Sequence, residues 1–292
     1  MAPRQQLDCL TRFHTTICWR GANKKINTSL FNSEMSFVDH LEELRWHVIR
    51  AVIALLIFTV AAFIKMDWIF REVLFAPSRP DFWTFELLCK HFDYCVGEAN
   101  FTLQSRTMTG QFSMHITAAF IIGFVVAFPY IFWEIWRFVK PGLKIKEQQN
   151  SMNAVLAVSF LFFLGVVFGY YMVLPITIQF LANYQIDPAI VNQFDVTSYI
   201  SMVCFMVLGC GLMFELPVLI YILSKMDMMT PKFMRTYRRH AIVVILFISA
   251  VLTPSPDMLS QLLIGIPLVL LYEISIFISA YVQNTKAKEE EF

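Results

Sequence analysis

Ionisable side chains crowd the stretch FVDHLEELRWHVIR, where Asp39, Glu42 and Glu43 come shortly before an apolar run that begins at Ala51. Asp39 and Glu43 are four residues apart, and like charges at that spacing destabilise a helix by about 0.2–0.5 kcal/mol. Carboxylates that are kept at such a cost next to a membrane are typical of a site for a basic ligand. The alternative is a solvated helix face.

The same stretch has a helical period, with Phe37, Leu41, Leu44 and Val48 on one side. The remainder carries charged and polar side chains, which are Asp39, Glu42, Glu43, His47 and Arg50. We therefore predict that this segment lies along the membrane interface and then turns into a first membrane span.

A second ionisable group, Glu215 in GLMFELPVLI, lies within an apolar run. A carboxylate at that depth costs at least about 2.5 kcal/mol on insertion scales, so it needs a cavity or a partner. Pro217 weakens the helix and frees backbone carbonyls, which favours a water-filled concavity. A structural pair with another helix is the alternative. Glu273 is nearer a helix end, where an interfacial role is expected, and Asp257 follows Pro256 as a helix cap would.

The six cysteines lack the spacing of a metal site. Cys204 and Cys210 are six residues apart in one helical run, so they point to different faces. Cys89 and Cys95 lie between two apolar runs, where an oxidising compartment would let them form a disulfide. Two unpaired thiols remain the alternative, because five intervening residues are not a specific spacing.

The elements that must position these groups are membrane helices. The 292 residues are 57% hydrophobic and 15% charged, with 29 phenylalanines, and the net charge of +1 excludes a nucleic-acid-binding face formed by the whole molecule. A span needs about 20 apolar residues. Six continuous runs qualify or nearly do, which predicts an all-α integral membrane protein: Trp46–Ile64, Gln111–Trp133, Val155–Leu174, Tyr199–Leu223, His240–Leu252 and Leu259–Tyr281.

The fifth run is short, because its apolar part, Ala241–Leu252, ends at Thr-Pro-Ser-Pro-Asp. We expect short fifth and sixth helices that form a hairpin, with thinning of the bilayer beside them. With the N-terminus inside, 18 of the 23 Lys and Arg residues are cytoplasmic and 5 are outside. Both termini are therefore predicted to be cytoplasmic.

Residues 1–34 are basic and have no apolar core of a secretory signal. We interpret them as a disordered tail or a translated extension before Met35, with an organellar transit peptide as the alternative. The expected organisation is then a membrane domain over residues 35–283 and a charged cytoplasmic tail over residues 284–292.

Residues Met35 to Gln283 resemble the TatC family, the polytopic receptor subunit of the twin-arginine protein translocase. The motifs that carry the resemblance are FVDHLEELR, FAPSRP, PYIFWEIWRFVKPGLKIKE, FELPV and LTPSPDMLSQ. The resemblance implies six helices in a concave bundle of the inner membrane, and no enzymatic activity or cofactor.

The resemblance also implies roles for single residues. It assigns binding of a twin-arginine signal peptide to Glu43, Arg45, Phe138, Pro141 and Glu147, and it makes Glu215 the intramembrane polar site. Gln148 and Gln149 depart from the basic residues that many relatives have after the loop glutamate, which affects the expected binding register. Structural or partner-docking roles fall on Pro77, Thr253, Asp257 and Gln261.

The partners that the resemblance implies are signal peptides of folded cargo, single-span TatA and TatB-type subunits, other copies of the chain and the lipid bilayer, with transport driven by the proton-motive force.

Two other classes of protein fit the sequence less well. A secondary transporter of a small solute would have paired, Gly/Pro-broken helices in matching halves, and the sequence has no internal repeat. An intramembrane aspartyl protease needs two facing carboxylates, and Asp257 falls at a turn. Gly165 and Gly169 indicate close helix packing.

Overall fold

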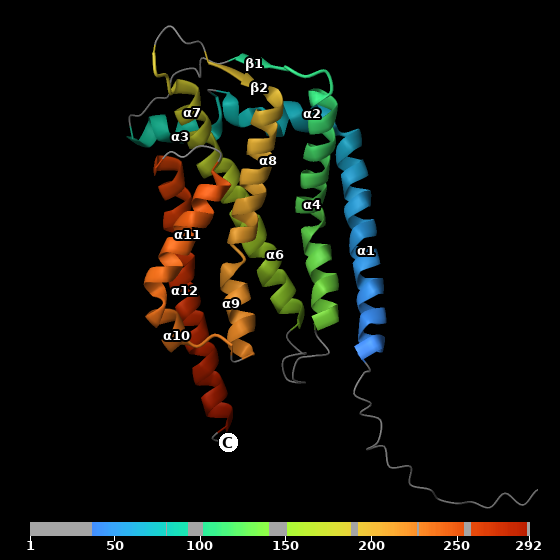
Figure 1. Ribbon diagram of the computed structural model, residues 1–292, viewed down its shortest axis with the longest axis vertical. Helices are drawn as coiled ribbons and strands as arrows, with labels where there is room; N and C mark the ends of the chain where they lie inside the picture. The colour runs from blue at the N-terminus through green and yellow to red at the C-terminus, as the bar shows by residue number, and fades with distance from the viewer. Residues whose placement is uncertain are drawn as a thin grey trace, which may run out of the picture. The chain divides into compact units, whose positions relative to one another are not determined.

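The computed structural model describes residues 37–79, 81–92, 102–139, 151–187, 192–226, 228–253 and 258–290. The first described residues, Phe37–Leu41, belong to one compact unit, and the chain from Glu42 onward forms a second. Within this second unit the long helices run side by side along one axis (Figure 1). They are the part of α1 (Phe37–Ile64) from Glu42 onward, α4 (Gly110–Val139), α6 (Ser151–Phe168), α7 (Leu174–Asn183), α8 (Val196–Met213), α9 (Leu216–Lys225), α11 (Arg238–Leu252) and α12 (Met258–Glu290).

The centre of the second unit is α8, which packs against both α4 and α6, while α9 packs against α12 and α12 against α11. Small residues permit the closest of these approaches. A Cβ atom added at Gly165 of α6 would lie 2.7 Å from the carbonyl oxygen of Cys210 in α8. This confirms close packing at Gly165, and Gly169 faces Cys210 in the same way.

Apolar side chains cover the outside of the bundle as well as its core. Ile200, Met206 and Leu268 are almost fully buried, whereas Phe160 and Phe247 are about two-thirds exposed, at 66% and 68%. An apolar exterior is expected where lipid is the solvent. Five described helical segments are long and apolar enough to cross a membrane: Leu44–Ile64, Gly110–Val139, Ala154–Asn183, Val196–Lys225 and Ser260–Thr285.

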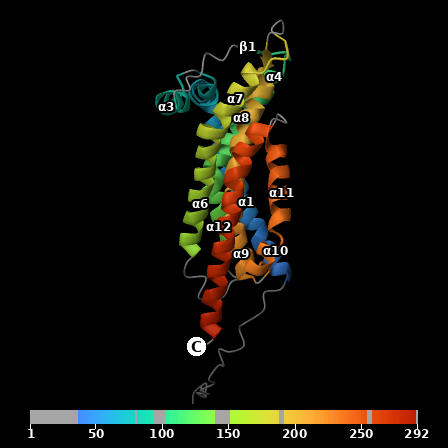
Figure 2. The same ribbon diagram turned by 90° about the vertical axis from the view of Figure 1, so that its left-hand side faces the viewer.

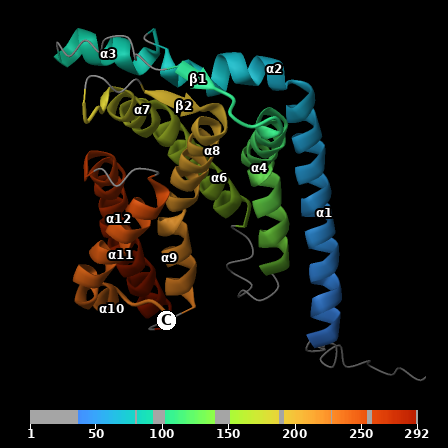
Figure 3. The ribbon, with the colours of Figure 1, turned by 45° about the horizontal axis from the view of Figure 1, so that its top comes forward.

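One end of the bundle carries short elements that lie across it, as Figure 3 shows. They are α2 (Met66–Ile69), the π-helical turn η1 (Phe70–Leu74), the 3-10 turn η2 (Ala76–Ser78) and α3 (Trp83–Phe92), and together they are termed the cap. The same end has a parallel pair of three-residue strands, β1 (Thr102–Gln104) and β2 (Gln193–Asp195), with Leu103 opposite Phe194. The opposite end, with the short helix α10 (Pro231–Thr236), is termed the α10 end.

The six apolar runs are all helical, as predicted, but two expectations need correction. The segment from Phe37 to Arg50 does not lie along the interface and then turn, because α1 is one helix from Phe37 to Ile64 and contains no Gly or Pro that could break it. The fifth helix, α11, is short at 15 residues, or about 22 Å. The sixth helix, α12, is not short as expected, because it has 33 residues. It continues through most of the segment assigned to the charged tail.

Candidate functional site

The acidic stretch at the start of α1 is described in part. Position 43 lies in α1, but its side chain is outside the described residues. Arg45 is exposed, and its guanidinium lies 5.6 Å from the ring centroid of Trp46. Pro141 and Glu147 lie outside the described residues, so their roles stay predictions. Phe138 is half-buried in the last turn of α4.

A buried pair of ionisable groups joins α1 to α4 near the α10 end. The imidazole Nδ1 of His47 lies 2.6 Å from Oε2 of Glu134, and their side chains are 9% and 1% exposed. Because an ionised carboxylate only accepts hydrogen bonds, the imidazole N–H is the donor. The contact fixes the rotation of α1 relative to α4 at this level.

The second oxygen of Glu134 also has partners. The hydroxyl of Tyr130 donates to Oε1 at 3.1 Å, and the guanidinium of Arg137 lies 3.8 Å from the same atom. Arg137 in turn lies 4.9 Å from the ring centroid of Trp133. Glu134 therefore has contacts to two groups of its own helix in addition to His47, as a buried carboxylate requires.

The sequence pattern does not single out either member of this pair. The helical wheel places His47 on a solvated face, whereas the residue is buried. Glu134 is inconspicuous within PYIFWEIWRFVKPG, although an acidic residue in an apolar run is a sufficient signal for a functional or structural site. The helical wheel is misleading because Val48, on the predicted apolar face, is 50% exposed.

Glu215 lies where the fourth span breaks between α8 and α9. It is the residue before α9, with φ −78° and ψ −7°, and Pro217 follows in the first turn. Proline has no N–H to donate to the carbonyl of Met213, which accounts for the break. Oε1 of Glu215 is buried and has no hydrogen-bond partner among the described residues. The alternative of a satisfied structural pair therefore has no support in the described part of the chain.

The residues expected to dock partners have contacts within the chain. Thr253 is buried, and its hydroxyl donates to the carbonyl of Ser249 at 3.1 Å. Gln261, in α12, donates through Nε2 to the carbonyl of Leu246 in α11 at 3.0 Å, which holds the hairpin of α11 and α12 together. Pro77 is buried in η2, and Asp257 lies outside the described residues.

The other ionisable and thiol groups have the following contacts. Arg238 donates two hydrogen bonds to Glu273 from a half-exposed position, and the interfacial role of Glu273 stays a prediction. Cys204 and Cys210 are free and buried, and no group of metal-binding side chains occurs among the described residues. Cys89 is disulfide-bonded, but Cys95 lies outside the described residues, so their pairing stays a prediction.

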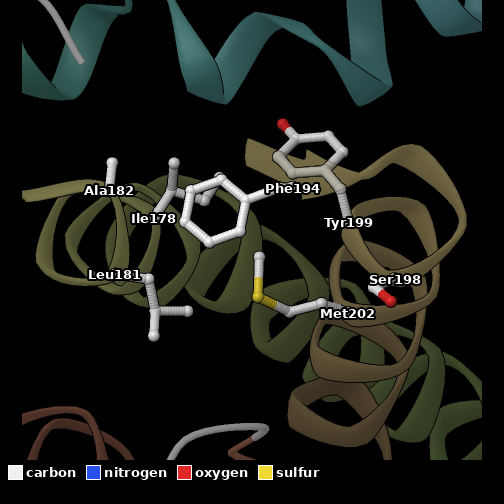
Figure 4. A pocket seen from close by; sticks show the side chains of 7 residues that line it. All are labelled: Ile178, Leu181, Ala182, Phe194, Ser198, Tyr199 and Met202. Atoms are coloured by element: carbon white, nitrogen blue, oxygen red, sulfur yellow. The ribbon is translucent and has the colours of Figure 1, made fainter. Parts of the chain in front are cut away.

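Two apolar cavities lie toward the cap. One, of about 160 Å³, lies between α7, β2 and α8, and Figure 4 shows Phe194, Tyr199 and Met202 around it. The other, of about 220 Å³, lies between η1, α4, the π-helical turn η4 (Gly169–Val173) and α8, with Val73, Ile121, Tyr170 and Val207 in its wall. Their linings offer apolar contact surface rather than ligands for an ion or a polar solute.

These features define a class of protein, namely a multi-pass helical membrane protein that holds ionisable groups between its spans. Residues 39–267 match the family of the Sec-independent protein translocase protein (TatC). The chain is 37% identical to TatC of Blattabacterium sp. subsp. Periplaneta americana over 87% of its own length and 98% of that protein. It is 32% identical to TatC of Aquifex aeolicus over 86% and 98% of the two chains.

Solved structures agree with the sequence matches. Two crystal structures of the twin arginine translocase receptor TatC, one of them in DDM, superpose with a TM-score of 0.67 at 32% identity. The structure in DDM covers 82% of this chain and 99% of the other. The chain belongs to the TatC family.

Proposed function

We propose that this protein is the signal-peptide receptor of a twin-arginine translocase in the cytoplasmic membrane, with both termini and the α10 end on the cytoplasmic side. The observation that carries the proposal, beside membership of the family, is the buried contact of His47 with Glu134. It holds α1 against α4 at the level of His47. The chain leaves α4 there through Phe138 and continues to Pro141 and Glu147.

Carboxylates at these positions suit an arginine doublet. A guanidinium meets a carboxylate through two parallel hydrogen bonds, a geometry that lysine cannot match. Position 43 is one helical turn before His47, so it lies on the same face of α1. Exposed ion pairs contribute about 0–1 kcal/mol each, so recognition needs both arginines together with apolar contact for the signal's hydrophobic region. Phe138 and the apolar helix surfaces supply that contact.

The same proposal gives the intramembrane groups a role in assembly. Single-span TatA and TatB-type subunits dock near α11 and α12, around Thr253 and Gln261, and Glu215 supplies an unsatisfied polar group within the membrane. A hydrogen bond between such a group and a polar side chain of a partner helix stabilises the association by about 0.6–2 kcal/mol in lipid. Export of folded cargo then depends on the proton-motive force, so an ionophore should stop transport without reducing signal binding.

Photo-crosslinking of a signal peptide tests the binding site. A probe next to the arginine pair should label the native protein in membranes. Replacement of Glu43→Arg or Glu147→Arg should each lower labelling about fivefold or more. Glu42→Arg is the matched control, because Glu42 is exposed beside Glu43 and has no assigned role. A signal whose arginines are replaced by glutamates should regain labelling of the double variant.

Unchanged labelling of the Glu43→Arg/Glu147→Arg double variant would defeat the proposal. Equal losses from Glu42→Arg would show instead that the general negative charge of the segment attracts the peptide. A signal with two lysines in place of arginines should label the native protein more weakly, because lysine cannot form the bidentate contact.

A further inference from the structure

The cap has a feature that signal recognition does not use, an exposed aromatic edge. Figure 2 shows α3 projecting to one side of the bundle, beside the upper end of α6 and α7. Trp83 in α3 is 59% exposed, Trp68 in α2 is 62% exposed, and Leu87, one turn after Trp83, is 42% exposed. Large apolar side chains are thus presented by helices that do not span the membrane.

The opposite side of the cap is fixed to the bundle. The hydroxyl of Tyr170, in the π-helical turn η4 (Gly169–Val173), donates to the carbonyl of Val73 in η1 at 2.7 Å. The hydroxyl of Thr84 in α3 donates to the carbonyl of Tyr171, and Tyr199 donates to the carbonyl of Leu74 at 3.0 Å. The contacts of Tyr170 and Tyr199 fix η1, and the contact of Thr84 sets the orientation of α3.

Aromatic packing strengthens that orientation. The ring of Phe82 stacks on Tyr171 at 5.6 Å and meets the edge of Tyr170 at 5.7 Å, and Phe85 is 3% exposed. The inward face of α3 is therefore already occupied. Its outward residues, Trp83 and Leu87, are held in place rather than free to fold back onto the bundle.

The outward edge continues the surface that faces lipid. Trp83 meets the edge of Tyr171 at 5.9 Å, and Tyr171 and Met172 are 39% and 47% exposed on the span Ala154–Asn183. Exposed charges lie beside the edge, among them Glu86 and Lys90. An aromatic edge between an apolar span and charged side chains matches the boundary between lipid headgroups and acyl chains, where tryptophan and tyrosine are enriched.

We propose that the edge formed by Trp83 and Leu87 of α3 inserts into the headgroup–acyl boundary of the leaflet at the cap end, that Trp68 of α2 inserts separately at the same level, and that both anchor the bundle at a fixed depth. The exposed charges of the cap have both signs, with Asp67, Glu72, Asp81 and Glu86 against Lys65, Arg71, Arg79 and Lys90. Insertion therefore depends on the boundary itself and not on anionic lipid. This role is separate from the signal site at the α10 end and does not depend on it.

Quenching of tryptophan fluorescence tests the depth. The full chain is placed in phosphatidylcholine nanodiscs with Trp83 or Trp68 as the single tryptophan and the other five changed to phenylalanine. Lipids with a nitroxide near the headgroup should quench either residue about twofold more than lipids labelled deep in the chain. Leu56→Trp in the tryptophan-free chain is the control, because Leu56 is 55% exposed near the middle of α1 and should give the reverse order.

Strong quenching of Trp83 by aqueous iodide would overturn the proposal, since it would place the edge in water. Protection of Trp83 from both iodide and labelled lipid would also overturn it, because a second copy or a partner protein would then cover the edge. An equal response in nanodiscs with and without anionic lipid is expected, and a dependence on anionic lipid would contradict the proposed basis of insertion.

A second measurement keeps the test valid if the tryptophan-free chain does not fold. A nitroxide at Leu87→Cys, in a chain that keeps its tryptophans, should be more accessible to oxygen dissolved in lipid than to a water-soluble nickel complex. The same label at Glu86→Cys, the adjacent exposed position, should be more accessible to nickel. Equal nickel accessibility at the two positions would show that the edge does not enter the membrane.

Discussion

The first span and the fourth span are held in very different ways. Within α1 only 11% of the residues of its membrane window are buried in the protein, whereas 50% are buried in the window formed by α8 and α9. The central span is fixed by continuous packing against its neighbours α4, α6 and α12. The first span instead lies at the outer edge of the bundle, beside α4 (Figure 1).

Specific contacts hold α1 where continuous packing does not. Along its length these include the buried pair of His47 with Glu134, the close approach of Thr59 to Gly123, and the stacking of Phe63 on His115 at 4.2 Å. A helix held this way can be released without unfolding its neighbours. Loss of one contact in α1 should therefore act locally, while a change in the α8 packing should act on the whole bundle.

The largest effect is expected from the buried pair. His47→Leu removes one partner of a buried carboxylate and should weaken the docking of α1 by about 2–3 kcal/mol, because Tyr130 and Arg137 still contact Glu134. Spin labels at Ile49 and Ile135, both exposed, should show a longer and broader distance distribution.

The double variant His47→Leu/Glu134→Leu should recover much of the native distance, since it leaves no unpaired charge. The global melting temperature should change less than the distance distribution in either variant. A single variant with the native distance distribution would show that the pair does not hold α1.

Two glycines give the direct comparison between the regions. A Cβ at Gly165 would meet the backbone of α8, with Cys210 O at 2.7 Å, and one at Gly123 would meet the backbone of Thr59 at 2.7 Å. Gly165→Ala should lower the free energy of unfolding by about 1–3 kcal/mol. Gly123→Ala should cost less, because α1 can move away.

Thermal unfolding in one detergent measures both variants. Gly265→Ala is the control, since its nearest neighbour is the end of the Leu246 side chain at 3.2 Å. If Gly123→Ala lowers the melting temperature as much as Gly165→Ala, α1 is as firmly integrated as the core and the comparison fails.

Replacement of Glu215 tests whether every buried side chain of the central span stabilises the bundle. Glu215→Leu removes a buried oxygen that has no described partner and should stabilise the bundle by about 1–2 kcal/mol, as measured by unfolding in mixed detergent. The same change should reduce transport if the carboxylate serves a partner helix. A loss of stability would indicate a contact from residues outside the described part of the chain.

The smallest expected effect concerns the packing of α9 on α12. The hydroxyls of Ser224 and Ser279 are 2.6 Å apart across these two helices. Ser224→Ala should cost only about 0.6 kcal/mol, the average for such bonds in membranes. If Ser224→Ala shifts the melting temperature more than Gly165→Ala does, hydrogen bonds rather than close packing are the main stabilising force between these helices.

The spans could be predicted because membrane helices depend on long apolar runs, and the break before α9 because Pro217 lacks a donor. The short α11 followed from the Pro-rich turn after Thr253. The pair of His47 with Glu134 could not be found from a helical wheel, because lipid inverts the rule that apolar faces point inward. The cap and the strands β1 and β2 are too short to leave a periodic pattern.

The π-helical turns of the cap end have a consequence for alignment of the chain with its relatives. A π turn closes its hydrogen bond over one residue more than an α turn, so η1 and η4 each accommodate an extra residue. Removal of one residue upstream of Tyr170 would convert the turn to an ordinary helix and would leave the packing faces of α6 and α7 nearly unchanged. A one-residue difference in length is thus tolerated in these two places, and a gap of a single position there would mark a relative that has an ordinary helical turn instead of the π turn.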